Sequence, residues 1–200
     1  MELPKPPHLR FGPDHPELEH SSYHLPPSCY KSDMPEDKLS EALAYQRKIS
    51  TLEEARLACE DYRKASRRIV FTNGCFDLLH PGHVRYLAMA RALGDILVVG
   101  LNADASVRRL KGASRPLQGE AARAEVLAAL ACVDHVVIFP EDNPLNLILA
   151  TKPDVLAKGA DWAAEEIIGG TEVRAWGGKV ARIQLVEGHS TSNLVEKARD

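Results

Sequence analysis

The sequence TNGCFDLLHPGH, residues 72–83, decides the fold. An apolar, β-branched run, Ile69–Phe71, comes directly before it, and a helical spacing of apolar residues begins at Val84. This order predicts a strand that turns sharply into a helix. His80 and His83 lie three residues apart at the start of that helix, so both side chains are expected to face one ligand.

The residues between the two histidines fit a phosphate site. The first turn of a helix presents free N–H groups and the positive end of the helix dipole, which together attract phosphate. Pro81 suits the first helical position, where its missing N–H would have no partner, and Gly82 lets a nucleotide approach the backbone. We therefore predict a nucleotide phosphate at this turn. The plainer alternative is a pair of surface histidines beside a tight turn.

The turn resembles the signature of the cytidylyltransferase-like nucleotidyltransferases, which share the His-x-Gly-His element with class I aminoacyl-tRNA synthetases. The resemblance extends over about two thirds of the chain, from Arg68 to Arg199. Within that superfamily, four later segments are most similar to the heptose 1-phosphate adenylyltransferases: NADASVRRLKG (102–112), SRPLQGEAARAEVLAALACVDHVVIF (114–139), PDVLAKGADW (153–162) and EGHSTSNLVEKAR (187–199).

The resemblance implies an enzyme with a defined set of site residues. His80, His83 and Lys111 would be catalytic and would neutralise charge on the triphosphate and the departing pyrophosphate. Nucleotide binding is assigned to Thr72, Asn73, Gly74, Cys75, Phe76, Gly82, Arg123, Lys158, Gly159, Asp161, Ser190, Thr191 and Ser192. Substrate contacts are assigned to Asp77, Asp104, Arg115 and Trp162.

Several of these residues also have a structural interpretation. A carboxylate at Asp77 serves equally well to fix the turn, and Arg123 is equally consistent with an exposed helix position. Lys111 follows two arginines, so that it also fits a solvated basic face. Ser190–Ser192 would by itself be no more than a helix N-cap.

Composition limits the partners. The 200 residues carry a formal net charge of −3, which argues against a nucleic acid bound through its phosphates. The 4 cysteines are scattered, and no residue spacing predicts a resident metal site. Mg²⁺ is expected to arrive with ATP. No long apolar stretch or signal peptide is apparent, which predicts a cytoplasmic protein without membrane contact. The relatives are commonly homodimers, so a homodimer is expected.

The chain is predicted to have three parts. Residues 1–37 carry most of the 13 prolines and half of the 8 histidines, and are expected to be a flexible tail. Residues 38–66 read as a helical extension in which Thr51 and Glu54 form a capping box. Residues 67–200 alternate strands and helices, which predicts a Rossmann-like five-stranded parallel sheet with helices on both faces. The strands are expected at 68–72, 95–101, 135–139, 154–158 and 180–185.

Three functions are compatible with the sequence. The leading one is transfer of AMP from ATP to a heptose 1-phosphate, giving ADP-heptose and pyrophosphate for lipopolysaccharide or a related glycan; the stand-alone form without a kinase domain is expected. A cytidylyltransferase acting on glycerol 3-phosphate or a phospho-amine is the first alternative. Such enzymes carry an arginine where Leu185 stands here, which disfavours that activity. A nucleotide-binding protein without turnover is the second alternative.

Overall fold

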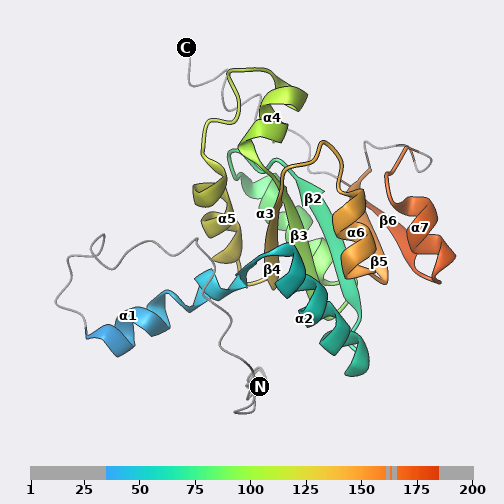
Figure 1. Cartoon of the computed structure of the whole chain (residues 1–200), viewed down its shortest axis with the longest axis horizontal. Coiled ribbons are helices and arrows are strands. Elements are labelled where there is room, and N and C mark those ends of the chain that lie inside the picture. Colours follow the sequence, from blue (N-terminus) through green and yellow to red (C-terminus); the bar gives the residue numbers. More distant parts are fainter. Residues whose placement is uncertain (1–34, 161–162, 164–165, 185–200) are drawn as a thin grey trace.

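The computed structural model describes residues 35–160, 163 and 166–184 (Figure 1). Its strands are β1 (Ile49–Ser50), β2 (Ile69–Gly74), β3 (Ile96–Asn102), β4 (His135–Phe139), β5 (Val155–Gly159) and β6 (Lys179–Ile183). Its helices are α1 (Glu36–Ala42), the 3-10 helix η2 (Ala44–Lys48), α2 (Leu52–Lys64), α3 (Pro81–Arg91), α4 (Asp104–Lys111), α5 (Glu120–Ala128), α6 (Leu145–Thr151) and α7 (Gly170–Ala175). All strand pairs described are parallel, in the order β1-β4-β3-β2-β5-β6.

The predicted layered α/β architecture is confirmed. The central strands are runs of Val, Ile, Leu and Phe whose side chains are buried on both faces, as a parallel sheet between helices requires. One core contains Leu87 of α3 and Leu127 of α5, and the core of the opposite face contains Ala55 of α2, Ile148 of α6 and Val173 of α7. Figure 1 shows α2 and α6 in front of the sheet and α3 behind it.

The sheet has six strands rather than the five expected, because the predicted helical extension contains a strand. Ile49 and Ser50 form β1, which pairs with Val136 and Val137 of β4. Two residues are too few for an alternating pattern to be read from sequence. Tertiary contacts hold this segment instead, since the Tyr45 hydroxyl donates to a carboxylate oxygen of α5 at 2.8 Å.

The capping box at the start of α2 is confirmed. The Glu54 backbone N–H donates to Thr51 Oγ1 at 3.2 Å, and the Thr51 backbone N–H donates to Glu54 Oε2 at 2.7 Å. Both otherwise unpaired donors are therefore satisfied, and α2 begins at a defined residue.

The strand order reverses next to β2. The chain builds β3 and β4 on one side of β2 and then returns to place β5 and β6 on the other side. In open parallel sheets, ligands bind beyond the carboxyl ends of the strands at such a reversal. Gly74 and Gly159, the last residues of β2 and β5, therefore border the expected crevice. Within the described part of the chain, no helix has the length and apolar character needed to cross a bilayer.

Candidate active site

His80 and His83 meet at the amino end of α3. His80 is the N-cap residue, and its Nδ1 accepts the backbone N–H of His83 at 3.4 Å. The two imidazole rings are stacked, with centroids 3.8 Å apart and planes inclined by 22°. The predicted convergence of the two side chains on one place is therefore present in the fold.

The ring of His83 is a neutral group at neutral pH. Burial lowers its pKa, and the adjacent His80 ring adds to this effect, so that the pKa of the His83 ring is about 4. Its Nδ1 is buried and has no hydrogen-bond partner among the described residues. Because buried polar atoms are normally paired, this nitrogen is a candidate for a contact with a bound ligand.

The turn before α3 is shaped by aromatic packing. Phe76 has a φ of 42°, in the left-handed region, and its ring lies 5.3 Å from the His83 ring in an edge-on contact. A Cβ added at Gly74 would approach the Phe76 ring to 3.0 Å, so glycine leaves the space that the aromatic ring needs. Deeper in the core, Thr72 Oγ1 lies 2.7 Å from the Tyr86 hydroxyl, which ties β2 to α3.

Lys158 reaches across the point where the strand order reverses. It lies near the end of β5, and its ammonium group donates to the side-chain oxygen of Asn73 at the end of β2. The recorded pairing of β2 with β5 stops at Phe71 and Leu156, so this side-chain contact joins the strand ends beyond the ladder. A cation is thereby placed at the same edge of the sheet as the histidines.

Lys111 ends α4 and is exposed. Its charge acts on the signature turn, because burial raises the pKa of the Cys75 thiol and the ammonium group of Lys111 opposes that rise. Gly82 is buried in the first turn of α3, and Gly159 closes β5 beside Lys158.

Arg123 is not an exposed helix residue. Its exposed fraction is 1%, and its guanidinium donates to the carbonyl oxygens of Gln118, Cys75 and Asn102. It also forms an ion pair with Asp104, at 2.8 Å between Nη2 and Oδ1. Both residues, which were assigned to ligand binding, thus contact protein groups beneath the turn.

The carboxylate of Asp77 likewise accepts hydrogen bonds from protein groups. Its exposed fraction is 2%, and one carboxylate oxygen accepts Arg115 Nε at 2.6 Å. The other oxygen accepts the backbone N–H groups of Leu117 and Gln118 at 2.8 and 3.0 Å. Fixing the turn, the structural interpretation of this carboxylate, accounts for both of its oxygens.

The remaining predicted site residues lie outside the described part of the chain: Asp161, Trp162, Ser190, Thr191 and Ser192. Among the described residues, no group of three or more His, Cys, Asp or Glu side chains is placed to hold a metal ion. The carboxylates of Asp77 and Asp104 accept hydrogen bonds from protein groups.

Sequence reasoning missed the residues that support the site from within. Tyr86 is one, and its spacing of six residues from His80 on α3 could have placed it on the sheet-facing side of the helix. Gln118 is another. Its backbone N–H is held by Asp77 and its carbonyl by Arg123, and no sequence pattern reveals such backbone contacts.

The chain is similar in sequence to known bacterial proteins. The chain is 57% identical over 163 residues to the bifunctional protein HldE of Acidiphilium cryptum, covering 82% of this chain and 34% of the relative. It is 54% identical over 159 residues to the bifunctional protein HldE of Syntrophotalea carbinolica, covering 80% and 32%. The chain thus spans about a third of the length of these curated relatives.

Two solved structures share the fold. The lipopolysaccharide core biosynthesis protein from Thermoplasma volcanium is 28% identical, with a TM-score of 0.51 over 62% of this chain and 99% of that one. The pantoate-beta-alanine ligase of Francisella tularensis has a TM-score of 0.52 at 15% identity over 76% of each chain, which is a likeness of fold alone. The cytidylyltransferase-like family model matches residues 71–196, more than half of the sequence, and the chain therefore belongs to the cytidylyltransferase-like family of nucleotidyltransferases.

Proposed function

We propose that this protein transfers AMP from ATP to a heptose 1-phosphate, giving ADP-heptose and pyrophosphate for lipopolysaccharide or a related glycan. The observation that carries the proposal is the stacked pair His80 and His83 at the amino end of α3, beside the strand-order reversal. The identity of 57% to a bifunctional HldE protein and the similarity to a lipopolysaccharide core biosynthesis protein support the sugar-nucleotide assignment.

In this reaction an oxygen of the sugar phosphate attacks the α-phosphorus of ATP. The new P–O bond forms as the bond from the α-phosphorus to the bridging oxygen breaks, and pyrophosphate leaves with the electron pair. The protein has little covalent work to do, because positioning and charge neutralisation lower the barrier.

The two histidines would act as donors to phosphate oxygens. Nδ1 of His80 accepts a backbone N–H, so a proton on Nε2 of this ring is the one that it can donate to a phosphate. His83 is neutral before ATP binds, and a nearby polyanion would favour its protonated form. Both rings would then stabilise charge that increases on the leaving pyrophosphate.

The two lysines would complete the phosphate site. Lys158, oriented by Asn73, would meet the phosphates at the strand ends, and Lys111 would approach them from the end of α4. Mg²⁺ would enter bound to the ATP phosphates and supply further charge neutralisation there, since this ion usually keeps phosphate and water ligands rather than a full protein cage. ATP and the sugar phosphate are small cytoplasmic metabolites, so we place the reaction in the cytoplasm.

Pyrophosphate release tests the proposal with four substrate pairs: ATP or CTP, each with heptose 1-phosphate or glycerol 3-phosphate. ATP with the heptose phosphate should exceed the other pairs in kcat/KM by orders of magnitude, because a site built to bond several hydroxyls rejects a substrate that lacks them. A preference for CTP with glycerol 3-phosphate would replace the proposal by the first alternative. ATP binding without release from any pair would favour the second.

We also propose a homodimer, as the family resemblance implies. Light scattering on the purified chain should give about twice the mass of the 22.0 kDa protomer. A monomer mass across the working concentration range would contradict it.

A further inference from the structure

Two buried charged residues, Asp77 and Arg123, form hydrogen bonds with the loop that follows Lys111. The loop spans residues 112–119, between the end of α4 and the start of α5, and begins at Gly112 with a φ of 96°. Such a φ strains any residue with a side chain, so the backbone leaves the helix sharply at this point. Most residues of the loop are exposed, and Arg115, Leu117 and Gln118 attach it to the signature turn by hydrogen bonds to Asp77.

Asp77 holds the loop from the side of the turn. Its carboxylate accepts three hydrogen bonds, all from loop residues: Arg115 Nε and the backbone N–H groups of Leu117 and Gln118. The carboxylate is 2% exposed, while Leu117 is among the exposed large hydrophobic residues at 52%. The loop is therefore fixed by this polar contact, and packing of the Leu117 side chain contributes little.

Arg123 holds the same loop from below. It donates to the carbonyl oxygen of Gln118 at 2.9 Å, to that of Cys75 in the turn, and to that of Asn102 at the end of β3. Gln118 is thus held at both ends of its backbone, its N–H by Asp77 and its carbonyl by Arg123.

We propose that Asp77 and Arg123 are positioning residues that hold the 112–119 loop, and with it Lys111, against the signature turn. This inference rests on the proposed nucleotidyl transfer, in which Lys111 approaches the phosphates. It assigns neither residue a contact with substrate or metal, in contrast to the ligand-binding roles that the family resemblance implies. Asp77 acts through Lys111, so its loss should misplace the lysine and leave the histidine pair in position.

A double-mutant cycle between Asp77 and Lys111 tests the coupling. The D77N variant removes the charge that Arg115 contacts and should lower kcat/KM by roughly 10- to 100-fold, the scale of a misplacement of about 1 Å. The K111A change should lower kcat/KM at least about 10-fold in the native chain but less than about 3-fold in D77N. In D77N the lysine is already displaced, so its removal has a smaller effect on the rate. If the fold losses in kcat/KM of the two single variants simply multiply in the double variant, the inference is wrong.

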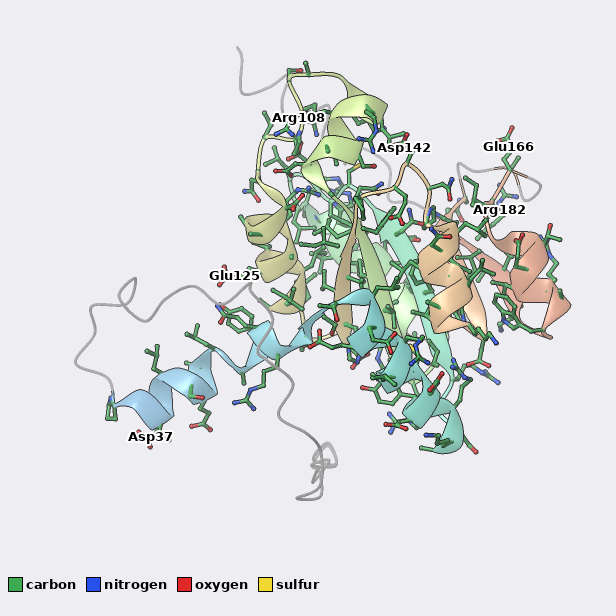
Figure 2. All side chains as sticks on the ribbon, in the orientation of Figure 1. Asp37, Arg108, Glu125, Asp142, Glu166 and Arg182 are labelled. Atoms are coloured by element: carbon green, nitrogen blue, oxygen red, sulfur yellow. The ribbon has the colours of Figure 1, made fainter. Side chains whose placement is uncertain are left out.

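Two controls separate positioning from direct contact. The D142N variant makes the same carboxylate-to-amide change at the exposed ion pair of Asp142 with Arg109, near α4 (Figure 2). This variant should have the native kcat/KM, and adding K111A to it should lower kcat/KM by the same factor as in the native chain. The Mg²⁺ concentration for half-maximal rate should stay the same in D77N. A several-fold rise in that concentration would mean that Asp77 meets the metal and would contradict the inference.

Hydrogen exchange tests the loop without substrate. In D77N the backbone amides of Leu117 and Gln118 should exchange at least about 10-fold faster, since local opening exposes them, while those of the central strand β3 stay protected. If D77N folds poorly, R115A removes one of the three loop contacts and should speed the same exchange by a smaller factor. Unchanged exchange in a folded variant would overturn the positioning role. Absence of any pyrophosphate release by the native chain would instead overturn the proposed function.

Discussion

His83 and His135 are both enclosed histidines whose pKa burial lowers, yet their surroundings differ. His135, at the amino end of β4, has both ring nitrogens occupied: Nδ1 lies 3.0 Å from the Ser50 hydroxyl and Nε2 lies 2.9 Å from the Tyr62 hydroxyl. His83, beyond the carboxyl end of β2, has a buried Nδ1 with no partner among the described residues.

The difference separates a structural histidine from a ligand site. Both ring nitrogens of His135 have protein partners, and the ring joins β1 and α2 to β4. The ring of His83 is left incomplete at a helix N-terminus, where a phosphate would complete it. Figure 2 shows Glu125 of α5 turned toward the N-terminal extension that contains η2 and β1, and Tyr45 donates to this carboxylate. The extension is therefore attached through several polar contacts of the same structural kind.

The largest expected effect comes from removing either histidine of the turn. H80A and H83A should each lower kcat of pyrophosphate release by roughly 100-fold or more, the scale for loss of a group that stabilises developing charge. H135A serves as the matched control and should keep kcat per folded molecule near the native value. Near-native kcat in both turn variants would remove the distinction between the two regions.

H135A should lower the stability of the fold rather than the rate of the reaction. Its loss leaves the hydroxyls of Ser50 and Tyr62 without their shared partner, which should cost about 1–3 kcal/mol in the free energy of unfolding. Urea denaturation of H135A and H83A, side by side, measures this. If H83A proved the more destabilised of the two, the assignment of a structural role to His135 alone would be wrong.

The sequence predicted the turn far better than the contacts beneath it. The strand, the glycine and the two histidines of residues 72–83 are local, and so their structure follows from order and spacing. The roles of Asp77 and Arg123 depend on carbonyl and N–H groups up to about 50 residues away in sequence, which composition and periodicity do not encode. For Arg123 the exposed helix position does not describe the buried position found.

Strand β1 was missed for a similar reason. Ile49 and Ser50 pair with β4 because Ser50 reaches His135 and Lys48 donates to the carbonyl of Leu130, and neither partner can be inferred from the two strand residues. The capping box at Thr51, in contrast, is a contact over three residues and was predicted correctly.

Acid should destabilise the fold through both histidines. Each has a folded-state pKa below the ordinary value, so the unfolded chain binds more protons once the pH falls below about 6.5. Their contribution to stability is complete above that pH and is lost as the pH falls, toward about 4 for His83. The free energy of unfolding should fall by at most about 1.4 kcal/mol per pH unit for each histidine that takes up a proton on unfolding. Denaturation midpoints between pH 7.5 and 4.5 should fall less steeply for H135A than for the native chain; parallel curves would contradict the burial argument for His135.

The smallest expected effect lies in the extension, away from both histidines. T51A removes the capping contact with the Glu54 backbone N–H and should cost about 1 kcal/mol of unfolding free energy. The kcat of the folded enzyme should not change. Thermal denaturation and pyrophosphate release on the same sample check both statements, and a loss of kcat would mean that the extension acts on the site.

Imidazole resonances of ¹⁵N-labelled protein, recorded at about pH 6 during a titration with MgATP, test whether the His83 ring binds the phosphates. MgATP should shift the His83 ring from its neutral form toward the protonated form, because the triphosphate raises its pKa. The His135 resonances, whose nitrogens both have protein partners, should stay in place. MgATP that binds without altering the His83 resonances would contradict the assignment of this ring to the phosphates.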